Sequence, residues 1–151
     1  MKVRAASFGV DPLLRTLAEF RFELRRFLHF SEGAALGAGL QPKQHQLLLQ
    51  VAGAPEGAVV TIAYAAERLG LKHNSAVELV NRSEREGLLK RAQDTADKRR
   101  AILRVTRKGN LILRHLAADH ARELNELAPH LGRALEHIKI HARNSIGSEA
   151  R

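Results

Sequence analysis

Residues 61–109 decide the fold and read TIAYAAERLGLKHNSAVELVNRSEREGLLKRAQDTADKRRAILRVTRKG. Thr61 is a good N-cap for a helix over residues 62–69, and Gly70 is a good stop for that helix. Residues 71–74 are expected to form a turn, after which a second helix runs to about Glu86. Two short helices joined by a tight turn at a glycine predict a helix-turn-helix.

A hairpin is predicted directly after these two helices. Residues 88–91 and 101–105 are its candidate strands, and the polar tip at 92–100 contains the turn formers Asp94 and Asp97. Thr106 is then a good cap for the helix that follows. The sequence therefore predicts a winged helix-turn-helix with a two-stranded wing.

Positive charge is concentrated in the same stretch. The chain has a net charge of +9 and a pI of about 10.8. Residues 72–108 contain eleven Lys and Arg against five Asp and Glu, which is +6 of that total. Charge that served solubility alone would be spread evenly along the chain, so this concentration favours a surface that binds nucleic acid.

The second helix of the pair has two different sides. At 100° per residue, one side carries Ala76, Leu79, Val80 and Ser83. The other side is polar and carries Asn74, Glu78, Asn81 and Arg85, flanked by Ser75, Val77 and Arg82. Such a face fits the major groove of duplex DNA, where each base pair shows a distinct pattern of donors and acceptors. Solvent exposure alone explains each residue singly, but it explains the whole set less well beside a basic hairpin.

The tip of the hairpin carries Asp97, Lys98, Arg99 and Arg100. An arginine at a hairpin tip can enter the minor groove next to the helix's site, where A·T-rich tracts concentrate negative potential. Asp97 lies two residues before Arg99 and can hold it by an ion pair. The alternative is a charged loop without fixed geometry, and the neighbouring helix makes that alternative the less favoured one.

On the N-terminal side, apolar residues at spacings of three and four predict a helix from Pro12 to about Phe30. Gly33, Gly37 and Gly39 are then expected to break the pattern. Four of the five Phe residues lie between Phe20 and Phe30. This cluster indicates either packing against a partner chain or a large core within one chain, and the sequence leaves both open.

Pro42 is a good first residue for a helix over 42–52, and Val59 and Val60 are a short extended pair. After Thr106, the apolar positions Leu111, Leu113, Leu116, Ala117, Leu124 and Leu127 predict one helix. Pro129 is expected to restart a last helix to about Asn144, with Leu131, Leu135, Ile138 and Ala142 facing inward. Residues 145–151 are expected to fray. The fold class is mainly α (α+β), in a single domain over residues 1–151.

The residues of the central stretch resemble the MarR family of transcriptional regulators. The similarity covers about residues 61–109: the run from Leu69 to Arg82, a helix that ends at Gly87-Leu88, a wing with Asp97-x-Arg99, and a second wing strand leading to Thr106-x-x-Gly109. Asp-x-Arg alone is a weak signal, whereas the ordered set is a strong one.

The resemblance implies an obligate homodimer that binds double-stranded DNA. It implies a DNA-binding lobe at 57–108 and a helical dimerisation region formed by 10–40 and 109–146, interleaved with the partner's. Arg99 would be the wing arginine for the minor groove, and Asp97 would orient it. Together with the helix wheel, this gives a predicted DNA-binding set: Lys72, His73, Asn74, Ser75, Val77, Glu78, Asn81, Arg82, Arg85, Asp97, Lys98, Arg99 and Arg100.

The sequence departs from the family's pattern in three places. Glu78 stands where many members have a basic or small polar residue, which leaves the base preference open; it can also pair with Arg82, four residues on. Tyr64 replaces the acid that completes a capping box with Thr61. Lys72 and His73 replace the usual small cap, so Asn74 is a candidate cap for a slightly shorter helix.

The sequence gives little support for an enzyme, a cysteine-based site or a membrane protein. The chain has no cysteine, which excludes disulfides and thiolate metal sites. No sequence motif of a hydrolase, nucleotide-binding enzyme or metalloprotease is present, so we expect no enzyme and no cofactor. The first fourteen residues contain no apolar run typical of a secretory signal, and no stretch is long and apolar enough for a membrane span, so we expect a cytoplasmic protein without membrane contact.

Family members often bind small aromatic effectors, and the expected lining of such a cleft here is Phe20, Leu24, Phe27, His45 and Leu49. Ordinary core packing is the competing explanation for these residues. We expect a repressor that binds an inverted-repeat operator and is released by the effector. The alternatives are a metal- or pH-responsive regulator that uses the eight histidines, with His137 and His141 on one helix face, and a DNA-coating protein without sequence preference.

Overall fold

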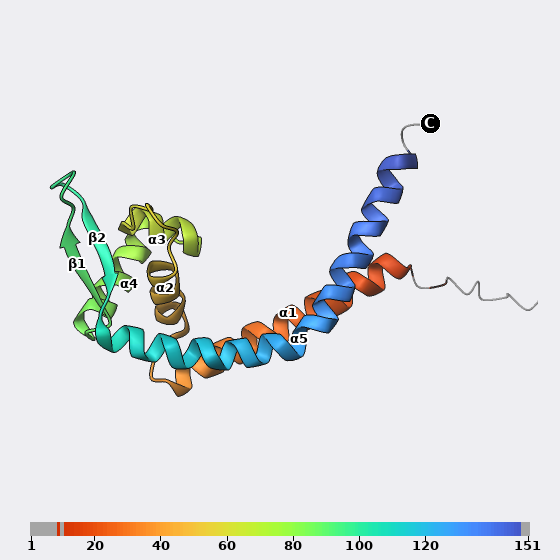
Figure 1. Ribbon diagram of the computed structural model, residues 1–151, viewed down its shortest axis with the longest axis horizontal. Coiled ribbons are helices and arrows are strands. Elements are labelled where there is room, and N and C mark those ends of the chain that lie inside the picture. The colour runs from red at the N-terminus through yellow and green to blue at the C-terminus, as the bar shows by residue number, and fades with distance from the viewer. Residues whose placement is uncertain (1–8, 10, 149–151) are drawn as a thin grey trace, which may run out of the picture. The chain divides into compact units, whose positions relative to one another are not determined.

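The computed structural model of the protein describes residue 9 and residues 11–148, with side chains through residue 144. The described elements are α1 (Pro12–Gly37), α2 (Pro42–Ala52), α3 (Ile62–Leu69), α4 (His73–Arg85), β1 (Leu89–Gln93), β2 (Ala101–Val105) and α5 (Arg107–Ser148) (Figure 1). The chain divides into two compact units. One contains the described residues up to Phe30 and from Arg122 onward, and the other is Ser31–Ala121.

The second unit contains the predicted helix-turn-helix. Thr61 caps α3, since its hydroxyl oxygen accepts a hydrogen bond from the Tyr64 N–H at 3.2 Å. Gly70 ends α3 with φ +62°, a left-handed conformation that side chains disfavour, and its N–H reaches the Ala66 and Glu67 carbonyls. The predicted bounds of α3 are therefore confirmed.

The inner side of α4 is the one that the helix wheel predicts. Ala76, Leu79, Val80 and Ser83 are all buried, and the Ser83 hydroxyl donates to the Leu79 carbonyl at 2.8 Å, so burial leaves no polar atom of Ser83 unsatisfied. The core around them also contains apolar side chains of α2, the hairpin and the start of α5: Leu47, Leu48, Leu88, Leu89, Leu103, Leu113 and Leu116. This core fixes α4 against the hairpin.

The hairpin is the predicted wing. β1 and β2 pair antiparallel from Leu89 opposite Val105 to Gln93 opposite Ala101. β1 begins one residue later and ends two residues later than expected. The extended pair at Val59 and Val60 is not assigned as a strand, but the Val60 carbonyl accepts a hydrogen bond from the Leu103 N–H of β2 at 2.7 Å.

Thr106 and Gly109 join the hairpin to α5. The Thr106 hydroxyl accepts from the Gly109 N–H at 3.2 Å, as expected for a cap, and donates to the Gly87 carbonyl at 2.6 Å. A Cβ on Gly109 would clash with the Leu88 carbonyl oxygen and would lie 2.7 Å from Val105 Cγ1. Gly109 is therefore required by the close approach of α5 to the hairpin.

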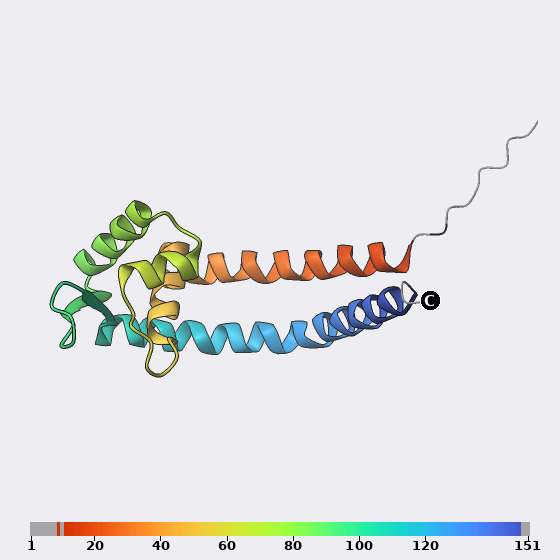
Figure 2. The same cartoon turned by 90° about the horizontal axis from the view of Figure 1, so that it is seen from above.

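The expected end of the first helix near Phe30 is wrong. α1 runs through Gly33 to Gly37 and appears as one uninterrupted helix in Figure 2. An interior glycine costs only about 1 kcal/mol relative to alanine, and the helix continues because Ala35, two residues later, is fully buried in the core. α1 ends where the Gly39 N–H bonds the Leu36 carbonyl and the Leu40 N–H bonds the Ala35 carbonyl.

The expected restart at Pro129 is also wrong, because Pro129 lies inside the single helix α5. An interior proline loses one hydrogen bond and costs about 3 kcal/mol. Leu127 and Ala134, on either side of it, are both buried, so the packed side of α5 continues across the proline. Residues 145–148 are helical rather than frayed, and residues 149–151 lie outside the described residues.

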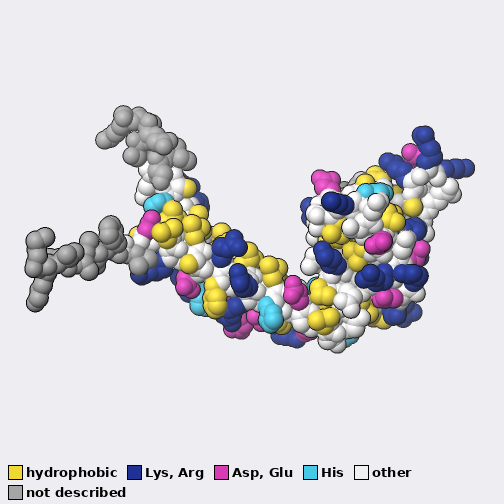
Figure 3. All heavy atoms as spheres, turned by 180° about the vertical axis from the view of Figure 1, so that it is seen from behind, with side chains coloured by type: hydrophobic (Ala, Val, Ile, Leu, Met, Phe, Trp, Pro, Cys, Tyr) yellow, Lys and Arg dark blue, Asp and Glu magenta, His cyan; other side chains and the backbone are white. Residues whose placement is uncertain are grey.

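Several apolar positions of the two long helices are exposed. Of the four residues expected to face inward after Pro129, Leu131 and Ile138 are half-buried, whereas Leu135 and Ala142 are exposed. Figure 3 shows hydrophobic side chains on the surface of these helices. None of the described helices is long and apolar enough to cross a membrane.

Candidate nucleic-acid interface

The start of α4 differs from one expectation. Lys72, not Asn74, is the N-cap, and its side chain makes no capping hydrogen bond. The residues His73, Asn74 and Ser75 therefore form the first turn of α4, and all three are exposed. The helix keeps its full length because Lys72 supplies the extended backbone (φ −66°, ψ 150°) that a cap position needs.

The outer face of α4 is open to solvent. Lys72, Glu78, Arg82 and Arg85 are exposed, while Val77 and Asn81 are half-buried. Glu78 and Arg82 form no ion pair among the described residues, so the spacing of four residues does not bring them together here. The carboxylate of Glu78 is left facing outward among cations.

The polar face extends beyond α4. A hollow of about 260 Å³ is lined by Ser75, Glu78 and Arg82 of α4 and by Gln41 and Lys43 at the start of α2. Sequence reasoning missed Gln41 and Lys43. A basic residue in the first turn of a helix that begins at Pro42 was visible in the sequence, but nothing there placed it beside α4.

Asn81 is held by the wing. The guanidinium of Arg91, on β1, donates to the Asn81 side-chain oxygen, and it lies 3.6 Å from a carboxylate oxygen of Glu84. The other Glu84 oxygen accepts from the Arg91 backbone N–H at 3.1 Å. Arg91 was not among the predicted site residues, because its position ten residues from Asn81 carries no sequence signal.

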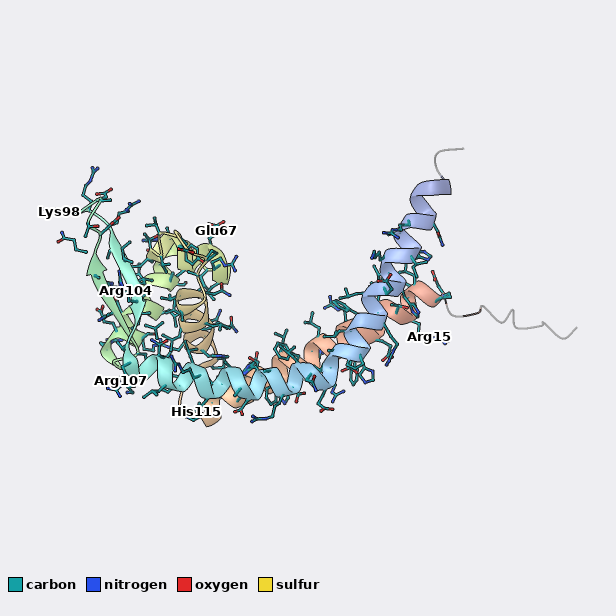
Figure 4. The ribbon with its side chains drawn as sticks, in the orientation of Figure 1. Arg15, Glu67, Lys98, Arg104, Arg107 and His115 are labelled. Carbon is teal, nitrogen blue, oxygen red and sulfur yellow. The ribbon has the colours of Figure 1, made fainter. Side chains whose placement is uncertain are left out.

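The tip of the wing contains the ion pair suggested by the spacing of Asp97 and Arg99. Asp97 Oδ1 accepts from the Arg99 backbone N–H at 3.0 Å and lies 3.4 Å from Arg99 Nε. The Arg99 side chain is 93% exposed, so this link is weak and leaves the guanidinium accessible. Lys98 projects from the tip beside it (Figure 4).

Arg100 is engaged within the wing. Its guanidinium lies 2.6 Å from Asp94, whose side chain is only 13% exposed. The other Asp94 oxygen accepts from the Ala96 N–H at 3.1 Å. The Ala96 N–H and then the Arg100 guanidinium lower the pKa of Asp94, so this carboxylate stays ionised and holds the turn. Sequence reasoning assigned Asp94 only to turn formation.

The predicted effector residues are divided between the two units. Phe20, Leu24 and Phe27 belong to one unit, and His45 and Leu49 to the other. Phe20 and Phe27 are half-buried, Leu24 and Leu49 are exposed, and His45 is buried. Their joint role stays a prediction.

His45 lies against a second histidine. Its ring centroid is 5.0 Å from that of His120, whose Nε2 is 2.8 Å from the Ser31 hydroxyl oxygen. Burial, and then the neighbouring His120, lower the pKa of His45. A neutral His45 is therefore favoured in the folded state.

The histidines form no evident metal centre. His137 and His141 line a hollow of about 270 Å³ with Pro12, Leu13 and Thr16. Among the described residues, however, no three His, Cys, Asp or Glu side chains are grouped so as to hold a metal ion. The metal-responsive alternative thus gains no support from this arrangement.

Comparisons with known proteins identify a matching family model and solved structures with the same fold. Residues 38–100 match the family model described as MarR family. A search of curated proteins finds no match. Solved structures of MarR-family winged-helix regulators share the fold.

Three of the similar structures illustrate the likeness. The MepR–DNA complex of Staphylococcus aureus is 18% identical, with a TM-score of 0.65 over 85% of this chain and 94% of that one. The PcaV transcriptional regulator of Streptomyces coelicolor is 25% identical, with a TM-score of 0.54 over 85% and 96%. A MarR family protein of Bacillus stearothermophilus is 21% identical, with a TM-score of 0.62 over 91% and 98%.

Proposed function

We propose that this chain, whose residues 38–100 match the MarR family model, is a homodimeric transcription regulator that represses by binding an inverted-repeat operator. MarR-family proteins are DNA-binding transcription regulators, and the MepR structure named above is a complex with DNA. In the proposed complex, two copies of α4 enter successive major grooves about 34 Å apart.

One observation carries the proposal most directly. A polar, open face of α4 lies on the same unit as a wing that presents Arg99 with 93% of its side chain exposed. The core residues beneath α4 are buried, so its outer face is available without any change of fold. The exposed cations of this unit attract the phosphates, and the polar groups of α4 read base edges.

The proposal of a homodimer is supported by apolar surface. Eight large hydrophobic side chains of the first unit are between 39% and 62% exposed: Leu14, Leu17, Phe22, Leu24, Leu28, Leu124, Leu135 and Ile140. Four of them, Leu14, Leu17, Leu24 and Leu28, lie within about 80° of one another around α1, and an exposed apolar stripe of this kind is typical of a protein–protein interface. A second copy of the chain brings the same surface, so two copies related by a two-fold axis can cover each other's apolar side chains.

DNA binding is tested by titrating the protein into labelled genomic fragments and then into the footprinted operator. Arg99→Ala is expected to weaken operator binding about tenfold or more, because the loss occurs at both wings of a dimer. Arg114→Ala is the matched control, since it removes the same charge from an exposed position of α5 outside α4 and the hairpin. Equal affinities for the Arg99 and Arg114 variants would remove the wing from the proposal.

The oligomeric state is tested by sedimentation at several protein concentrations. We expect a dimer that Leu28→Glu converts toward a monomer, because the substitution places a charge on the exposed apolar surface. A wild-type monomer at micromolar concentration would contradict the proposal.

Two further measurements test whether the protein prefers the operator sequence and whether an effector releases it from DNA. Equal affinity for random and operator duplexes at fixed salt would favour a DNA-coating protein instead. Release by an effector is proposed from the family resemblance. The test is whether a small aromatic compound lowers the affinity of the protein for the operator. A compound that binds the free and the DNA-bound forms equally well would leave that affinity unchanged.

A further inference from the structure

The contact between the wing and α4 carries an inference about how the DNA-reading face is set. Arg91 of β1 reaches two residues of α4 that lie three positions apart, Asn81 and Glu84. Residues at this spacing share one side of a helix, so a single guanidinium spans the last turns of α4. The inference rests on the proposed function and names a determinant of its specificity.

Glu84 of α4 contacts β1 through two groups of Arg91. One of its carboxylate oxygens accepts the Arg91 backbone N–H at 3.1 Å, and the other lies 3.6 Å from the Arg91 guanidinium. The main chain and the side chain of Arg91 are thus both attached to the same residue of α4. This arrangement sets the position of β1 relative to α4.

The chemistry of arginine fixes the orientation of the Asn81 amide. A guanidinium has five N–H donors and no acceptor, so the Asn81 atom that faces it must be the oxygen. The Asn81 amide nitrogen, with two N–H donors, then lies on the other branch of the side chain. These two donors have no partner among the described residues.

We propose that Arg91 is a positioning residue that presents the amide donors of Asn81 to hydrogen-bond acceptors on DNA. The acceptor class is an oxygen or ring nitrogen, such as guanine O6 or N7, thymine O4 or a phosphate oxygen. An asparagine that reads adenine uses its oxygen and its nitrogen together. Because the Asn81 oxygen already accepts from Arg91, Asn81 can contact DNA only by donating from its amide nitrogen.

The test is a double-mutant cycle on operator binding with Asn81→Ala, Arg91→Ala and the double variant. Each single variant is expected to lose about tenfold in affinity, and the double variant also about tenfold, because both remove the same contact. Independent contributions would multiply to about a hundredfold loss, and that result overturns the proposal. Thermal unfolding of each variant identifies any loss that comes from unfolding.

Salt dependence separates positioning from direct phosphate contact. If Arg91 neutralised a phosphate, Arg91→Ala would lower the slope of log affinity against log salt by about 0.9 for each subunit. The proposal expects an unchanged slope. It also expects that Arg91→Lys fails to restore affinity, because an ammonium group lacks the planar fork of the guanidinium. A lower slope with rescue by lysine would mean that Arg91 touches DNA itself.

Asn81→Asp provides the variant that keeps the contact with Arg91. Its carboxylate still accepts from the guanidinium but has no N–H donors, so we expect an unchanged melting temperature and affinity no better than that of Asn81→Ala. Wild-type affinity for this variant would refute the proposal. If the loss of affinity depends on which base pairs the operator carries, the acceptor is a base. If the loss is the same for all operator sequences, the acceptor is a phosphate oxygen. Both results agree with donation by the Asn81 amide.

A failure of the proposed function would look different from a failure of this inference. If the wild-type protein ignores duplex DNA at low salt, the proposed function falls and this inference falls with it. If the wild-type protein binds an operator but the two variants act independently, only the inference fails.

Discussion

Replacing Gly109 with alanine is expected to destabilise the protein by about 2 kcal/mol. The added Cβ would clash with the Leu88 carbonyl oxygen and lie 2.7 Å from Val105 Cγ1, well inside ordinary van der Waals contact. The Leu88 main chain cannot easily move, because its N–H bonds the Ser83 carbonyl and its oxygen accepts from the Thr106 N–H.

The magnitude follows from two opposing effects. Forcing an extra carbon into a packed site costs about 1–3 kcal/mol, and backbone atoms that cannot give way place Gly109 at or above the upper end of that range. Alanine recovers about 1 kcal/mol of helix propensity over glycine. The net loss corresponds to a fall of about 4–8 °C in melting temperature for a chain of this length.

Circular dichroism at 222 nm during heating measures this fall. Gly132→Ala is the control in the same helix, because nothing lies within 4 Å of its added Cβ; helix propensity alone should leave its melting temperature equal to or above that of the wild type. A Gly109→Ala variant as stable as the wild type would refute the claim that α5 approaches the hairpin too closely for a side chain.

Two further predictions concern pH. The lowered pKa of Asp94 means that its contribution to stability is present in full above its unfolded pKa of 3.8 and is lost as the pH falls through the lower folded value. Asp94→Asn should therefore reduce the loss of stability as the pH falls below 3.8, measured as melting temperature against pH. It should also weaken operator binding at neutral pH, because the turn that carries Arg99 loses the ion pair between Asp94 and Arg100. The lowered pKa of His45 means that its neutral form is favoured on folding, so stability should be complete above the unfolded pKa of 6.5 and decline as the pH falls from there toward the lower folded value. His45→Phe should flatten this decline, and an unchanged pH profile would show that His45 is not its source.

The sequence predicted both ends of α3 and the start of α5. Thr61, Gly70 and Thr106 act where expected, because caps and stops depend on hydrogen bonds and backbone angles within a few residues. The buried side of α4 was equally accessible to prediction, since a period of 3.6 residues determines which side chains share a face.

The long helices were harder to predict. Gly33 and Pro129 each carry a local penalty of about 1–3 kcal/mol, and reasoning from local preference places a break at such residues. Tertiary packing outweighs both penalties, as the burial of Ala35 beyond Gly33 and of Leu127 before Pro129 shows. That burial depends on what the helix meets in space, which no window of sequence contains.

By itself, the sequence determined the helix-turn-helix with its wing, the basic charge around it and the orientation of α4. Only the tertiary structure decided that Arg91 takes the oxygen of Asn81, that Asp94 occupies Arg100, and that Lys43 shares a hollow with Arg82. The physical reason is range: caps and helix faces depend on neighbours within one or two turns, whereas these contacts join residues that meet only after the core has brought separate elements together.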